Sequence, residues 1–220
     1  MKKLISLLVV IQMVMLLFVP AFAEEFSLRN DIHFGDTKEQ VRSKETIPID
    51  ESESDDFGIQ TQKGMAAGFD GVEIFYSFSA DNKLKEVTWD LPNSVTVDES
   101  DNAYDKLKNA MKSKYGNALG YTNGDCYIIT GKAIGWAVGL VSIFQTSSNG
   151  VGDIRDYDEW DYEYQPGKHV KIEIIQYYYG TSYASRRYGI RVGYKFFTDE
   201  DLTAAMAEKQ AENQKVINDI

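Results

Sequence analysis

Cysteine is almost absent from this sequence, which has Cys126 alone among its 220 residues. No disulfide can therefore form within the chain, and a hydrophobic core has to supply the stability. Cys126 with His169 as its base is one conceivable nucleophilic pair. Reactive cysteines are commonly set at a helix N-terminus, whereas residues 125–129 have a strand pattern, so a buried and inert cysteine is favoured.

Histidine is nearly as scarce, since only His33 and His169 are present. Neither stands in the short spacing of histidines or cysteines that binds zinc, so no zinc site is predicted. The sequence also lacks the Gly-x-Ser-x-Gly elbow of serine hydrolases and the glycine-rich loop that holds phosphates. No catalytic residue and no bound cofactor is therefore predicted from a motif.

Positive charge is in deficit, with 23 basic residues against 34 acidic ones and a formal net charge of −11. Such a surface repels a polyanion. The basic residues at 106–114 and 186–187 are too sparse to follow a phosphate backbone. Nucleic acid is therefore not expected as a partner.

Long hydrophobic runs are lacking except for one at the N-terminus, over residues 4–20. It follows Lys2 and Lys3 and precedes small residues at Ala21 and Ala23, which is the pattern of a cleaved signal peptide. We expect cleavage after Ala23, secretion or another extracytoplasmic location, and no stable membrane insertion afterwards. An uncleaved anchor is the alternative, because about 17 apolar residues reach the lower limit for a membrane span.

Residues 24–220 predict a single α+β domain. A short helix is expected to start within 35–41, where a capping box can form, and to end by Ile47 and Pro48, and a solvated loop is expected over 50–56. The period then changes to two, which predicts a hairpin with one buried face over 57–91. A second helix is expected at about 101–115, with its apolar residues at Ala103, Leu107, Ala110, Met111 and Tyr115.

The remaining chain predicts four strands and a third helix. The strands are expected at 126–130, 134–144, 170–178 and 188–197, and the helix at 198–220. The helices would pack on one face of an antiparallel meander sheet. Two structural repeats, at about 26–97 and 98–197, are also plausible, and whether the two halves form one sheet or two stays open.

Residues 34–37 read Phe-Gly-Asp-Thr and are followed by Val41. This helix start resembles that of small bacterial envelope proteins, the SmpA/BamE-like assembly lipoproteins and the tandem-repeat β-lactamase inhibitor proteins. The resemblance implies helices packed on an antiparallel sheet and a role in binding other proteins without catalysis. The chain lacks the lipid-bearing cysteine of the first group and the paired cysteines of the second, and no functional residue is carried over.

Acidic residues crowd between 153 and 163. Asp153, Asp156, Asp158 and Asp161 could supply the hard oxygen ligands that calcium prefers, although their spacing matches no known calcium loop. The alternative is a solvated hairpin tip between two strands. Calcium is therefore a candidate cofactor and not an expected one.

Aromatic residues alternate with these acids and continue beyond them. Large rings with polar tips suit contacts with proteins or sugars. The alternative is that outward-facing rings merely cover the sheet. The candidate binding surface comprises Tyr157, Trp160, Tyr162, Tyr164, Tyr178 and Tyr183.

Together these patterns favour an exported, non-enzymatic binding module of the bacterial cell envelope or medium, whose partner is a protein or a glycan. A hydrolase of envelope polymers is the first alternative, with Asp158 and Glu163 as acid and base. A calcium-stabilised structural protein is the second.

Overall fold

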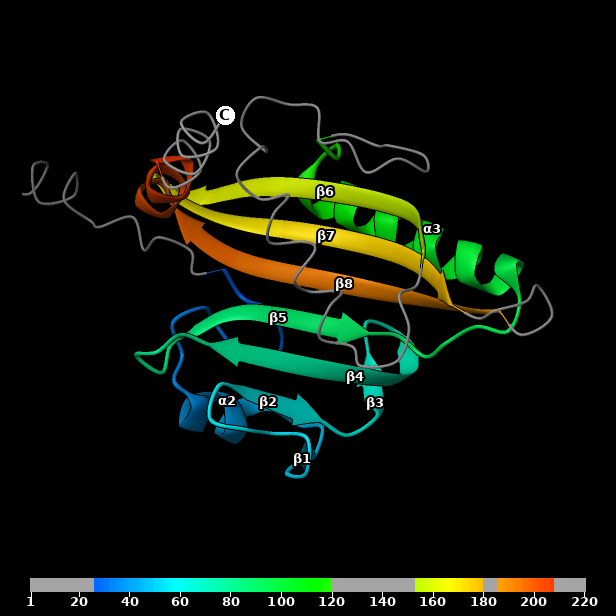
Figure 1. Cartoon of the computed structure of the whole chain (residues 1–220), viewed down its shortest axis with the longest axis horizontal. Coiled ribbons are helices and arrows are strands. Elements are labelled where there is room, and N and C mark those ends of the chain that lie inside the picture. The colour runs from blue at the N-terminus through cyan, green and yellow to red at the C-terminus, as the bar shows by residue number, and fades with distance from the viewer. Residues whose placement is uncertain (1–25, 120–152, 180–185, 208–220) are drawn as a thin grey trace, which may run out of the picture.

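The computed structural model describes residues 26–119, 153–179 and 186–207, which form an antiparallel sheet of eight strands with helices (Figure 1). The helices are α2 (Lys38–Lys44), α3 (Val97–Tyr115) and a C-terminal helix whose described part is 199–207. The strands are β1 (Ile49–Asp50), β2 (Gly58–Thr61), β3 (Gly64–Ala66), β4 (Phe69–Phe78), β5 (Leu84–Asp90), β6 (Asp153–Gln165), β7 (Lys168–Tyr179) and β8 (Arg187–Thr198). The predicted α+β class is confirmed.

The strand order is β1-β2-β4-β5-β8-β7-β6, with β3 paired to β4 outside this path. β5 and β8 meet in the middle, where Trp89 lies opposite Val192 and Asp90 opposite Arg191. The two halves of the chain therefore form one continuous sheet. Each half supplies a helix and an antiparallel meander, and the last strands of the two meanders pair with each other. The division into two repeats stays a prediction.

α2 begins at the predicted capping box. The Thr37 hydroxyl accepts a hydrogen bond from the Gln40 amide, and the Gln40 side chain accepts one from the Thr37 amide at 2.8 Å. The two bonds satisfy N–H groups that the first helical turn leaves unpaired. Val41 is fully buried and carries the helix onto the core.

The predicted hairpin of the first half is confirmed as β4 and β5. Its buried side chains alternate along each strand, and the reverse turn between the strands includes Asn82, whose φ is positive. Because side chains point alternately to the two faces of a sheet, the residues between them lie on the other face. Phe75 is among these and is partly exposed.

α3 begins at Val97, four residues before the predicted start. Thr96 is the reason, because its hydroxyl accepts a hydrogen bond from the Glu99 amide and caps the helix. Tyr104 belongs to the buried face, whereas Ala110 is exposed, contrary to the prediction. Tyr104 supplies a ring and a polar tip at a position that apolar spacing alone did not select.

Residues 153–163 are not a hairpin tip but most of β6. The tip lies further on, at Pro166 and Gly167, where Gly167 has a φ of +71°. β6 pairs with β7 along nearly its whole length, so the acidic stretch belongs to a regular sheet. β7 and β8 confirm the predicted strands at 170–178 and 188–197, whereas the predicted strands at 126–130 and 134–144 lie outside the described residues.

The main core lies between the sheet and the helices. Val41 of α2 and Tyr104, Leu107 and Met111 of α3 join one cluster with inward-facing residues of the strands. Figure 1 shows α3 running behind β6 and β7, and α3 also contacts β8. Both helices therefore cover the same face, here called the helix face, and the opposite face is called the second face. No helix within the described residues is long and apolar enough to cross a membrane. The predicted signal peptide lies outside these residues.

Candidate functional site

The alternation along β6 divides the acidic and aromatic residues between the two faces of the sheet. Asp158, Trp160 and Tyr162 lie opposite Ile174, Ile172 and Val170 of β7, and these residues belong to the helix face. The positions between them belong to the second face, which carries Tyr157, Glu159, Asp161 and Glu163. What reads as one patch in the sequence is therefore two separate sets of side chains.

Trp160 belongs to the core and not to a binding surface. Its side chain is 2% exposed, and its indole N–H donates a hydrogen bond of 3.0 Å to the carbonyl of Gly116, just after α3. A partner cannot reach it without opening the domain. The prediction of Trp160 as a contact residue is wrong.

The other predicted contact residues are scattered. Tyr162 and Tyr164 pack with Phe26 of the N-terminal segment, and Tyr162 remains 37% exposed. Tyr157 is buried on the second face and donates a hydrogen bond to Glu159. The Arg186 guanidinium lies over the ring of Tyr178, with its Cζ 4.4 Å from the ring centre of the tyrosine. Tyr183 lies outside the described residues. These rings do not form one surface.

The calcium set is divided in the same way. Asp156 and Asp158 lie on the helix face and Asp161 on the second face, so they cannot surround one ion. The described residues contain no group of three His, Cys, Asp or Glu side chains able to hold a metal. Nothing is described of the Asp153 side chain. The geometry contradicts the proposed calcium site.

Asp158 is instead a buried structural anion, 1% exposed. Its Oδ2 accepts a hydrogen bond of 2.7 Å from the Tyr104 hydroxyl and lies 2.7 Å from Lys108 Nζ. Glu163 points to the opposite face, where its Oε1 accepts a hydrogen bond from the Gly167 amide. Two carboxylates on opposite faces cannot flank one glycosidic bond, so this acid and base pair is also contradicted.

Asp158→Asn is expected to lower the free energy of unfolding by about 1–3 kcal/mol, because the buried contact with Lys108 loses its charge complement. Urea unfolding of the purified protein measures the effect. Glu163→Gln is the control, because the amide oxygen can still accept the Gly167 hydrogen bond. Equal stability of the two variants would contradict a structural role for Asp158.

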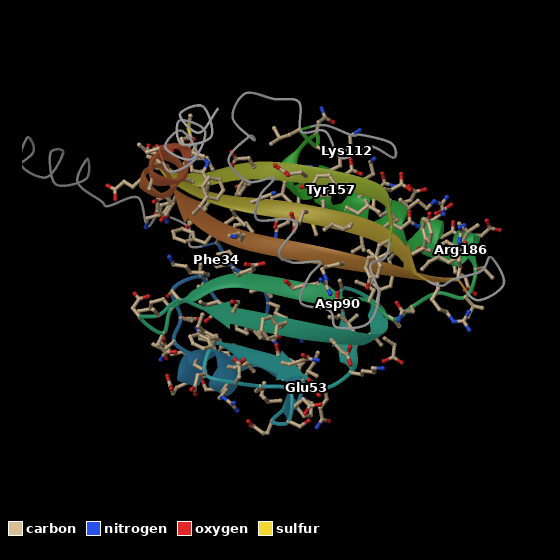
Figure 2. The ribbon with its side chains drawn as sticks, viewed as in Figure 1. Phe34, Glu53, Asp90, Lys112, Tyr157 and Arg186 are labelled. Atoms are coloured by element: carbon tan, nitrogen blue, oxygen red, sulfur yellow. The ribbon has the colours of Figure 1, made fainter. Side chains whose placement is uncertain are left out.

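The second face carries a cross-strand array of charged side chains, and Figure 2 views the sheet from this face. Lys171 Nζ lies 3.0 Å from Glu159 and 3.4 Å from Glu173. Arg191 binds Asp90 through two contacts of 2.6 and 2.8 Å. Planar guanidinium and carboxylate groups match in such a pair, which fixes the orientation of both side chains.

Burial shapes the electrostatics of this array. Lys171 and Glu173 are both buried although both side chains are ionisable. Burial raises the pKa of Glu173, and so does the negative charge of Glu159, while Lys171 acts in the opposite direction. The pairing with Lys171 therefore offsets part of the cost of removing the carboxylate from water.

Three glycines make room for large side chains on the second face. A Cβ at Gly58 would stand 2.3 Å from the ring of Phe75, and one at Gly189 would stand 2.4 Å from the ring of Tyr177. A Cβ at Gly193 would stand 2.9 Å from Glu173. The side chains of Phe75, Tyr177 and Glu173 therefore lie across neighbouring strands, and the face has low relief there.

Comparison of the chain with protein-family models, with curated proteins and with solved structures gives no match.

The second face was not predicted from the sequence, although the pattern of β7 indicated it. Lys171 and Glu173 alternate there with fully buried isoleucines, which is typical of a strand with one apolar and one polar face. Their charge partners come from β6 and could be assigned only once the register was known. Cys126 lies outside the described residues.

Proposed function

We propose that the protein is an exported, non-enzymatic binding module and that its partner, a protein with a basic surface, contacts the second face of the sheet. The observation that carries the proposal is the charge balance of that face. Its basic side chains are His169, Lys171, Arg187, Arg191 and Lys195, whereas its acidic ones are Asp50, Glu73, Glu86, Asp90, Glu159, Asp161, Glu163 and Glu173. Complementary charge steers association and selects among partners.

The organisation of the face supports a binding role. The two contacts between Arg191 and Asp90, whose side chain is 36% exposed, hold this carboxylate in place before a partner arrives. Lys171, Glu159 and Glu173 are too buried to touch a partner directly. Preorganised side chains lose less conformational entropy on binding. The low relief around Gly58 and Phe75 suits a broad contact better than a narrow substrate pocket.

A protein partner is favoured over a glycan by the state of the rings. Sugar recognition by stacking needs aromatic faces open to solvent, but Tyr157 is buried and Tyr177 is half-buried. Phe75 is the more exposed ring, and it lies beside charged residues such as Glu73. Charge and a single apolar contact match a protein surface.

Reversing one charge on this face tests the proposal. Glu73→Lys is expected to weaken partner binding about tenfold, because it places a cation beside the acidic array. Asp105→Lys is the matched control, since Asp105 is exposed on α3 and makes the same change of charge on the other side of the sheet. Both variants are immobilised beside the wild-type protein, and retention of exported proteins from the source is quantified at low and high salt.

Equal retention by the two variants would contradict a partner site on the second face. A thermal-shift screen with peptidoglycan fragments and common glycans separates the remaining partner class. A stabilising glycan whose effect persists in Glu73→Lys would overturn the basic-protein partner.

A further inference from the structure

His169 joins three elements at one end of the sheet. It lies on β7, its Nδ1 is 3.0 Å from Asp161 Oδ1 on β6, and its Nε2 is 3.2 Å from Asp199 Oδ1 at the start of the C-terminal helix. The ring also stacks on Phe197 of β8, with 5.0 Å between the ring centres. The imidazole thus has a carboxylate at each of its two nitrogens.

This arrangement requires a particular protonation state. An ionised carboxylate can only accept hydrogen bonds, and a neutral imidazole carries a single N–H. Neutral His169 can therefore donate to Asp161 or to Asp199 but not to both. Only the imidazolium, with two N–H groups, satisfies both contacts at once.

We propose that His169 is a pH-sensitive clamp that fastens the start of the C-terminal helix to the β6–β7 hairpin when its imidazole is protonated and releases one of the two contacts when it is neutral. Histidine is the side chain that most often changes charge between about pH 5 and 8.

A backbone hydrogen bond also joins the start of the C-terminal helix to the β6–β7 turn, so the imidazole adds to a contact that is already formed. The Asp199 amide donates a hydrogen bond of 3.2 Å to the carbonyl of Gly167, in the turn between β6 and β7. The Thr198 hydroxyl accepts a hydrogen bond from the Asp201 amide and caps the helix. The Asp201 carboxylate accepts hydrogen bonds from the hydroxyl and the amide of Thr198, and these lower the pKa of the Asp201 carboxyl. Figure 1 shows the helix start beside this end of the sheet.

The charged groups around the imidazole come from all the elements that pack there. β6 contributes Asp161 and also Glu163, which lies opposite His169 in the register. β7 contributes Lys171 and β8 contributes Lys195, both one step further along the second face. The helix contributes Asp199. Lys171 forms ion pairs with Glu159 and Glu173. The carboxylates that contact the ring directly are those of Asp161 and Asp199.

The sign of the pH dependence follows from the contacts. The bridge needs a protonated imidazole and two ionised carboxylates. It is lost as the pH rises and His169 becomes neutral, and also as the pH falls and the carboxylates become protonated.

Hydrogen exchange of the helix amides at 203–207 tests the clamp in the purified protein. After correction for intrinsic exchange, their protection is expected to fall about threefold between pH 5.5 and pH 8, as one charge-assisted contact is lost. His169→Gln, whose amide is neutral throughout this range, is expected to show low protection at both values. Asp199→Asn is expected to behave like His169→Gln.

Glu200→Gln is the matched control, because it removes the same charge from the same helical turn without touching the imidazole. It is expected to keep the pH response of the wild-type protein. The proposal is overturned if His169→Gln or Asp199→Asn retains the wild-type pH response, or if the wild-type protection does not change with pH. Asp199 is exposed, so its substitution leaves the fold in place even where His169→Gln disturbs packing.

Discussion

Trp160→Ala is expected to lower the free energy of unfolding by about 3–5 kcal/mol, the usual cost of truncating a buried Trp side chain. The substitution removes the largest of the fully buried side chains and leaves a cavity between β6 and α3. It also deletes the indole donor to the Gly116 carbonyl, which closes the C-terminal end of α3. Urea or guanidinium unfolding, followed by far-UV circular dichroism because the variant lacks a tryptophan, measures the loss of free energy of unfolding.

Tyr162→Ala is the control for Trp160→Ala, because Tyr162 lies two residues further on the same strand and the same face. Its ring is 37% exposed and contacts Tyr115 edge to face, with 5.2 Å between the ring centres. A loss of only about 1–2 kcal/mol is expected. If both variants lost the same stability, depth of burial would not be the cause.

Glu45→Ala is expected to be as damaging, with a loss of about 3–5 kcal/mol, because it removes a buried carboxylate that several donors share. The Glu45 side chain is 0% exposed. Its Oε1 accepts hydrogen bonds from the amides of Thr46 and Ile47 and lies 3.4 Å from Arg29. Its Oε2 accepts one from the hydroxyl of Tyr76, which is fully buried in β4.

The loss of Glu45 would leave those donors without an acceptor inside the protein. Burial raises the pKa of Tyr76, and so does the negative charge of Glu45, so the hydroxyl keeps its proton and needs an acceptor. Arg29 would also lose its counter-charge, and the hydrogen bonds of Arg29 and Asn30 to the Thr46 hydroxyl would be left to link the N-terminal segment to the end of α2. Thermal unfolding and urea unfolding both report this change.

Glu51→Ala separates burial from charge as the cause. Glu51 also pairs with an arginine, Arg42, through two contacts, but its side chain is 70% exposed. Exposed ion pairs contribute little because water and salt screen them. A melting temperature close to that of the wild-type protein is expected for Glu51→Ala, and a large drop would show that the arginine pair itself, and not burial, sets the stability.

Much of the fold could be predicted from local patterns. The capping box at Thr37 and Gln40 predicted α2, because capping depends on residues only three positions apart. The alternation in β4 and β5 predicted their buried face, since a period of two is a property of each strand by itself. These interactions join residues that are close together in the chain, so they could be predicted from the sequence.

The candidate site was harder to predict, because it depends on the register of the strands and on which face of the sheet the helices cover. The sequence showed that residues 153–163 are rich in acids and aromatics, but not that they form a strand. A shift of one residue along a strand exchanges its two faces, and only the pairing of β6 with β7 fixes which residues face α3. Trp160 was therefore predicted to be a surface residue, and Asp158 and Glu163 were predicted to lie close together.

The sequence by itself determined the α+β class, the one-sided burial of the strands and the cap of α2, because each depends on residues close together in the chain. The tertiary structure alone decided that β5 and β8 join the halves into one sheet. It also decided that Glu45 meets Tyr76, and that His169 stands between Asp161 and Asp199. These contacts join residues that are 8 to more than 100 positions apart, and their free energy exists only when the helix, sheet and turn that carry them are already packed together.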